Sequence, residues 1–150
     1  MLTCYDIAHY FITSVDVKCG EGLTHLKLQK LLYYAQGFHL ALYDTPLFSE
    51  AIEAWHHGPI VLEVYEQYKE HKDQFLQVPE RVDLPIYPSD IKELLNEVHN
   101  TYGQFSAWKL KELTLEEPLW KNAYGCEDFI ISQEEMRTFF KALLVEPHAA

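Results

Sequence analysis

The chain has 150 residues, of which 48% are apolar and 14% aromatic, so it can bury the core of one ordinary domain. Its formal net charge is −11, and such a surface would repel the phosphate backbone of DNA or RNA. Direct nucleic-acid binding is therefore not expected, whereas a basic protein partner would be attracted. The alternative interpretation is that the acidity serves solubility alone.

The sequence predicts a cytoplasmic protein. It contains no stretch of 18 apolar residues that could cross a membrane, and its first residues lack the basic start and cleavage pattern of a secretory signal. The three cysteines, Cys4, Cys19 and Cys126, are widely spaced and form no C-x-x-C motif. Reduced thiols in the cytoplasm are the simplest interpretation.

Capping signals and apolar periodicity predict a mainly α, compact single-domain helical fold. Thr3 and Asp6 have the spacing of a capping box before a first helix. Thr24 precedes a second helix that extends to about Tyr43 and is apolar on nearly every side. A helix of that kind is expected at the centre of its domain.

Four more helices are expected in the second half of the chain. Ser89 and Ser106 are expected to cap two of them, and Pro118 to begin one or two helical turns. Ser132 and Glu135 form a capping box before the last helix. The expected buried face of that helix consists of Met136, Phe139, Phe140, Leu143 and Leu144.

A small β element, a short strand or hairpin, is expected near residues 50–56 and 80–85. Residues 50–55 alternate in polarity like a strand, and a segment near Val82 could pair with them. Gly58 is expected to supply backbone freedom, and Pro59 to begin a helix that continues to about residue 72.

The stretch AWHHGPI, residues 54–60, raises the question of a metal or catalytic site. On a strand, His56 and His57 would point to opposite faces, and no H-E-x-x-H or Cys-His cluster accompanies them. We expect a structural role, with His57 bonded to a backbone carbonyl at the turn, and neither a metal nor a catalytic residue. The alternative is a small metal-dependent hydrolase that uses this region with Glu53.

Two other groups of polar residues are candidates for function. Adjacent carboxylates such as Glu116–Glu117 are interpreted as solvated or capping charges near a helix start. Lys27, Gln29, Lys30 and Tyr34 are proposed as an exposed patch that contacts a partner, and the alternative is an ordinary pair of surface lysines. No glycine-rich phosphate loop is present, and no cofactor is expected.

Residues 23–68 carry an ordered motif: a Lys-Leu-Gln-Lys-Leu-Leu-Tyr helix, a Pro-Leu-Phe turn, then Glu-Ala-Trp and Gly-Pro. This motif closely resembles the Panacea domain family, also described as phage-associated or GepA-like proteins, which includes the SocA type of antitoxin. The matching positions are residues 27–33, 46–48 and 53–55 together with Gly58, Pro59 and Tyr65.

A later stretch, TYGQFSAWKLKELTLEEPLWKNAY, resembles the family less closely. Leu115 stands where the family often has histidine, and Leu119 separates Pro118 from Trp120. If that histidine serves chemistry in relatives, this chain lacks it, so the difference disfavours an enzyme.

The resemblance implies one Panacea-like domain over residues 1–150 that acts as an antitoxin and not as an enzyme. It would neutralise a protein toxin, encoded by an adjacent gene, by direct binding, without a nucleic-acid or membrane partner. The alternative is a protease adaptor that delivers its partner for degradation. The motif residues expected to serve the fold are Leu28, Tyr33, Trp55, Gly58, Pro59, Tyr65 and Trp120, with Trp55 anchoring the core.

Overall fold

The computed structural model describes residues 2–19, 23–71, 74–77 and 84–145, and these form a mainly α-helical fold with one small antiparallel sheet. The elements, in chain order, are α1 (Cys4–Cys19), α2 (His25–Tyr43), β1 (Ile52–Trp55), β2 (Gly58–Val61), α3 (Leu62–Tyr68), the 3₁₀ turn η1 (Lys69–His71), α4 (Ser89–Tyr102), α5 (Ala107–Leu115), α6 (Pro118–Tyr124) and α7 (Gln133–Val145). Both parts of the predicted fold class, the helices and the small β element, are confirmed.

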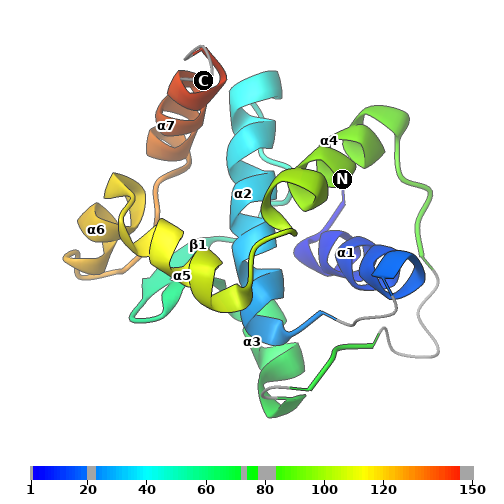
Figure 1. The fold of residues 1–150 in the computed structure, drawn as a ribbon. Coiled ribbons are helices and arrows are strands. Elements are labelled where there is room, and N and C mark those ends of the chain that lie inside the picture. Colours follow the sequence, from blue (N-terminus) through cyan, green and yellow to red (C-terminus); the bar gives the residue numbers. More distant parts are fainter. Residues whose placement is uncertain (1, 20–22, 72–73, 78–83, 146–150) are drawn as a thin grey trace.

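Helix α2 stands at the centre of the fold, with α1 and α4 on one side and α7 on the other (Figure 1). It contacts α1, α3, α4, α5, α7 and β2. Thr24 caps its start as predicted, because its hydroxyl accepts a hydrogen bond from the Lys27 backbone N–H at 3.4 Å. Asp44 ends it in the left-handed conformation, with φ at +60°. The remaining elements therefore pack around one helix.

The sheet is a hairpin of β1 and β2, with Ile52 opposite Val61 and Trp55 opposite Gly58. The other edge of β1 is covered by residues 129–131: Phe129 O accepts from the Ala54 backbone N–H at 2.7 Å. A further bond of 2.8 Å joins the Ile131 N–H to Ile52 O. Both edges of β1 are thus paired, and the hairpin connects α2 to the start of α7.

The strand at 52–55 is confirmed, but its partner differs from the expected one. Residues 80–83, part of the expected partner segment, lie outside the described residues, and residues 58–61 form the second strand instead. Pro59 therefore lies in a strand, and the next helix begins at Leu62. Gly58 has φ at +112°, which glycine adopts without strain, so the chain reverses directly after His57.

Most of the predicted helix starts are confirmed. Thr3 and Asp6 exchange bonds of 2.9 and 3.3 Å, Ser106 caps α5, and the Ser132 hydroxyl accepts from the Glu135 N–H at 3.2 Å. Pro118 is the first residue of α6 as predicted.

Two details of the helix predictions are wrong. Pro88, not Ser89, is the N-cap of α4, and no side chain caps that helix. In α7, Met136 and Phe140 are buried, whereas Leu143 and Leu144 are 37% and 46% exposed. The spacing predicted which side chains share a face of α7, but the last turn of that face is exposed.

Helix α7 packs closely against α2 at Gly37. A Cβ atom built on Gly37 would overlap the ring of Phe140, whose side chain is fully buried. Phe140 also makes edge contacts with the rings of Tyr33, Tyr34 and Phe38, at centroid distances between 4.8 and 6.0 Å. Glycine at this position therefore allows the close approach of α7, as its unusual place inside a helix predicts.

We expect Gly37→Ala to lower the free energy of unfolding by about 1–3 kcal/mol, the typical cost of overpacking a core. Alanine would otherwise favour the helix by about 1 kcal/mol, so a loss of stability shows that the ring contact outweighs propensity. Urea unfolding measures the difference.

Gly125→Ala is the matched control, because a Cβ on Gly125 would meet its nearest atoms only at 3.9 Å and its φ of −84° suits alanine. If Gly37→Ala were as stable as this control, α7 would not be held by the close approach at Gly37.

Candidate partner-binding groove

The residues proposed as an exposed contact patch lie mostly in the interior. Gln29, Lys30 and Tyr34 are buried, each at most 1% exposed, so the expected exposure is wrong for these three. Lys27 is half-buried, and its ammonium donates to Gly103 O, at the end of α4, over 2.6 Å. They are buried because α2 is surrounded, and their role in partner binding stays a prediction.

Gln29 connects α2 to the hairpin through its side-chain amide. Its Oε1 accepts from the Val61 N–H at 2.8 Å, and its Nε2 donates to Val61 O at 3.3 Å. Its Nε2 also lies 2.9 Å from a ring nitrogen of His25. One side chain thereby satisfies both backbone groups of a buried strand residue, which explains why an amide is needed there.

Lys30 is a cation enclosed between α2, β2 and α5. Its Nζ donates to Pro59 O at 3.2 Å, and a Cβ on Gly58 would lie 2.8 Å from Nζ and 3.0 Å from the Thr114 hydroxyl. Burial, with a smaller effect from the positive charge of Lys111, lowers the pKa of Lys30 to about 7. The absence of a side chain at Gly58 is what makes room for this ammonium.

Glu117 is a buried carboxylate at the start of α6. The Tyr33 hydroxyl donates to Oε1 at 2.6 Å, and the Tyr34 hydroxyl donates to Oε2 at 3.0 Å. Burial raises the pKa of Glu117 to about 7, although the two tyrosine bonds act in the opposite direction. Glu117 is the N-cap residue of α6, but its half-buried side chain makes no capping hydrogen bond and is bonded to the two tyrosines instead.

The two tyrosines bind the carboxylate from within an aromatic cluster. The Tyr34 ring stacks on Tyr102 of α4 with centroids 3.9 Å apart, and burial together with Glu117 raises the pKa of both Tyr33 and Tyr34. Sequence reasoning missed Glu117, although the Tyr-Tyr pair in a buried helix was a signal that two hydroxyls needed a partner.

His56 and His57 form the hairpin turn, not strand positions. Their ring centroids are therefore 4.6 Å apart, and the expectation that they point to opposite faces is wrong. Nδ1 of His57 is buried without a hydrogen-bond partner, so the bond expected to a carbonyl is not made by that nitrogen. Burial and the nearby charges of Lys30 and His56 lower the pKa of His57 to about 4.

The metal-dependent hydrolase would need several metal ligands close to this turn. The described part of the chain holds no group of three or more His, Cys, Asp or Glu side chains that could bind one metal ion. The Glu53 carboxylate accepts from the Trp55 ring N–H at 2.9 Å.

The motif tryptophans join the hairpin to α6. The Trp120 ring N–H donates to Trp55 O at 2.6 Å. Trp55 itself is half-buried against Tyr65, with ring centroids 4.8 Å apart, so it lies at the edge of the core and not within it. Of the other motif residues, Leu28, Tyr33, Gly58 and Pro59 are buried.

We call the buried network of Gln29, Lys30, Tyr33, Tyr34 and Glu117 the polar hub. It fastens the hairpin and α6 to α2 through side-chain bonds. Its Gln29, Lys30, Tyr33 and Tyr34 side chains are buried, and Glu117 is half-buried.

A groove of about 680 Å³ is lined by residues of α2, α4 and α7. In Figure 1, α4 and α7 flank the C-terminal half of α2. Leu42, Leu143 and Leu144 are 37–50% exposed there, above the buried Leu94 and Val98 of α4. The groove is lined by Phe38, Leu42, Tyr43, Asp90, Glu93, Leu94, Glu97, Val98, Thr101, Tyr102, Leu143 and Leu144. Its volume is in the range of ordinary ligand sites.

The groove has one charged wall, formed by Asp90, Glu93 and Glu97 of α4. Among the described residues, no lysine or arginine lines the groove, and no cation lies within ion-pair distance of these three carboxylates. The arrangement of an apolar floor beside unpaired charges is typical of a surface that binds another protein.

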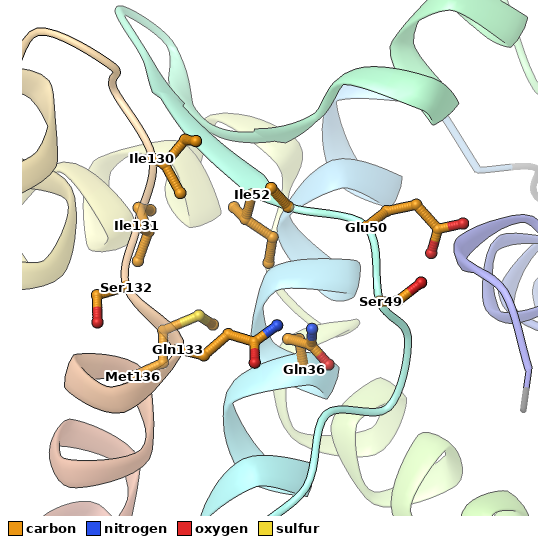
Figure 2. Close-up of a pocket in the computed structure, with 10 residues that line it drawn as sticks. Gln36, Ser49, Glu50, Ile52, Ile130, Ile131, Ser132, Gln133 and Met136 are labelled. Atoms are coloured by element: carbon orange, nitrogen blue, oxygen red, sulfur yellow. The ribbon is translucent and has the colours of Figure 1, made fainter.

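A second, smaller pocket of about 250 Å³ lies between residues 49–52 and 130–136, with Gln36 behind it (Figure 2). Its polar groups already serve the fold. The Gln36 amide bonds to Phe48 O and to the Leu47 N–H at 2.9 and 2.7 Å, and Glu50 accepts from the Cys4 N–H at 3.1 Å. Figure 2 shows Glu50 turned away from Ile130 and Ile131, so the groove is the better candidate.

Comparison with known protein families identifies the family of this chain. A family model described as "Antitoxin SocA-like, Panacea domain" matches residues 28–121. The chain belongs to this family. Neither the curated proteins nor the solved structures that were searched contain a match. The resemblance seen in the motif is thereby confirmed.

The part that matches the Panacea domain contains the whole polar hub, from Gln29 to Glu117, and the α4 wall of the groove. The α7 wall, at residues 133–145, lies beyond the match. Membership of an antitoxin family suggests a protein that acts by interaction and not by catalysis. No helix of the described residues is both long and apolar enough to span a membrane.

The raised pKa of Glu117 predicts that the free energy of unfolding depends on pH between about pH 4.5 and 7. Its pKa is higher in the folded protein than its ordinary 4.5, so the folded state holds more protons and its stability falls as pH rises through this window. Glu117→Gln removes this loss. Relative to the wild type, the variant gains about 1–3 kcal/mol between pH 5 and 8, at about 1.4 kcal/mol per pKa unit.

Urea unfolding of both proteins at several pH values gives the difference. Glu116→Gln is the control, because the carboxylate of Glu116 is next in sequence to Glu117 but is exposed. Parallel curves for the wild type and Glu117→Gln would show that Glu117 does not titrate differently in the folded protein.

The lowered pKa of Lys30 predicts that stability increases with pH above about pH 7, opposite to the effect of Glu117. The pKa of Lys30 is lower in the folded protein than its ordinary 10.5, so the unfolded chain holds more protons and stability rises as pH increases above 7. Lys30→Met keeps the length of the side chain without the charge. It should abolish this rise between pH 7 and 9, whereas Lys109→Met, at an exposed site on α5, should retain it. A rise that persists in Lys30→Met would disprove the assignment.

Proposed function

We propose that this protein is the antitoxin of a toxin–antitoxin pair and neutralises a protein toxin by binding it directly. The observation that carries the proposal is the match of residues 28–121 to the SocA-like antitoxin family. The toxin is the product of an adjacent gene, and both act in the cytoplasm. The Panacea-like domain extends over residues 1–150, since α1 and α7 pack against α2 from outside the matched region.

The groove supports neutralisation by contact. It exposes leucines from two helices beside three carboxylates that form no ion pair with a described residue, whereas four of the five hub residues are buried. Exposed apolar side chains that gather on one face commonly mark protein-interaction sites. We therefore assign toxin binding to the groove. Tyr34 of the hub supports two of its helices, because its ring stacks on Tyr102 of α4 and contacts Phe140 of α7.

The proposal predicts that one neighbouring reading frame arrests growth when induced alone in a heterologous bacterium, and that co-expression of this chain restores growth. The two proteins should then co-purify as a stable complex. Leu42→Lys, at a floor position that is 50% exposed, should abolish rescue because it places a charge on the apolar floor.

Phe75→Lys is the matched control. Phe75 is 58% exposed and lies far from the groove. Its neighbour Leu76 donates its N–H to Leu23 O, just before the N-terminal end of α2, whereas the groove lies at the C-terminal half of that helix. If no neighbouring frame were toxic, or if toxicity persisted with this chain present, the antitoxin proposal would fail. Rescue accompanied by disappearance of the toxin would favour the protease adaptor over neutralisation by binding.

A further inference from the structure

We propose that the groove receives a basic, amphipathic α-helix of the partner. The inference rests on the proposed function for the identity of the partner, but its chemistry follows from the groove itself. The juxtaposition that carries it is the row of Asp90, Glu93 and Glu97 along one wall beside the exposed Leu42, Leu143 and Leu144. A segment that fits must present an apolar stripe flanked by positive charge.

The walls favour a helical occupant over an extended one. The groove is bounded by α2, α4 and α7, and the backbone groups in the middle of a helix are already paired within it. An extended peptide on the apolar floor would find no backbone partner there and would leave its own amides unsatisfied. A helix satisfies its amides internally and binds through side chains at helical spacing.

The length of the charged wall gives the size of the occupant. The carboxylates at positions 90, 93 and 97 share one face of α4, and the lining residues of this helix extend from Asp90 to Tyr102. Twelve helical steps cover about 18 Å, at 1.5 Å per residue. A partner helix of about three turns, lying along α4, would therefore contact the whole groove.

The charge of the groove is not cancelled from the opposite wall. The basic residues of α7, Arg137 and Lys141, lie 3.3 and 2.8 Å from the Asp44 carboxylate, which pairs with both. The last turn of α7 presents Leu143 and Leu144 instead. The three carboxylates of α4 are thus available to lysine or arginine side chains of the partner.

Charge also argues against a second copy of this chain in the groove. Each copy carries a net charge of −11, so two copies repel each other.

A designed peptide tests the proposal with the full-length protein. The probe is a fluorescently labelled helical peptide of about 18 residues with leucines on one face and lysines on the other. The control peptide has the same sequence with every lysine replaced by glutamate. Fluorescence anisotropy at low salt should show binding of the lysine peptide. The glutamate peptide should bind at least about tenfold more weakly.

Variants locate the site. The double variant Glu93→Gln with Glu97→Gln should weaken the lysine peptide about fivefold or more, since each exposed charge pair contributes modestly. Leu144→Lys should weaken it further. The double variant Glu70→Gln with Glu127→Gln removes the same charge from exposed positions outside the groove, and should bind like the wild type.

Three results would overturn the inference: equal binding of both peptides, equal loss in the groove and control variants, or a wild-type dimer in sedimentation that Leu144→Lys dissociates. The toxin assay distinguishes failure of this inference from failure of the proposed antitoxin function. Toxin rescue that survives the groove variants would reject the groove and keep the antitoxin. Peptide binding that depends on the groove, with no toxic neighbouring reading frame, would keep the groove and reject the antitoxin function.

Discussion

A helix that is buried on nearly every face must find an internal partner for each polar group it carries, and α2 is such a helix. Unpaired polar groups in the interior cost several kcal/mol, and unpaired charges cost more. Gln29 therefore takes both backbone groups of Val61, and Lys30 takes the carbonyl of Pro59. These bonds are possible only if the hairpin lies directly against α2, so the polar side chains of α2 determine where the hairpin packs.

The same constraint explains how the distant parts of the chain are joined. The hydroxyls of Tyr33 and Tyr34 need an acceptor, and Glu117 supplies two oxygens at 2.6 and 3.0 Å. One turn further along α2, Gly37 lets Phe140 lie against the helix backbone, where its ring also contacts Tyr33 and Tyr34. Because α2 fixes α4, α6 and α7 in this way, the groove between α4 and α7 is a consequence of packing around one helix.

Local signals in the sequence predicted much of the fold. Thr3, Thr24, Ser106 and Pro118 mark helix starts because capping and proline geometry depend on a few neighbouring residues. The motif also predicted the family, since its residues are contiguous. The strand at Pro59 was missed because a Gly-Pro step suits both a turn before a helix and a turn within a hairpin.

The candidate site was harder to predict, for a physical reason. Lys30 and Glu117 belong to residue types that are almost always exposed, and only tertiary partners far along the chain reveal their burial. Likewise, Leu143 and Leu144 have the spacing of a buried stripe, but they are 37% and 46% exposed. Spacing shows which side chains share a face, whereas their exposure depends on how far the neighbouring helices extend.

The position of the groove relative to the hub bears on how one fold could serve different partners. The family match ends at residue 121, so it includes the hub and α4 but not α7. Leu143 and Leu144, and the carboxylates of Glu93 and Glu97, are exposed, and substitutions at exposed positions usually change stability by less than about 0.5 kcal/mol. Substitutions in the hub would instead leave buried groups unpaired. In the proposed mode of binding, substitutions of the wall residues would change the partner that fits the groove, while the hub residues would continue to stabilise the fold.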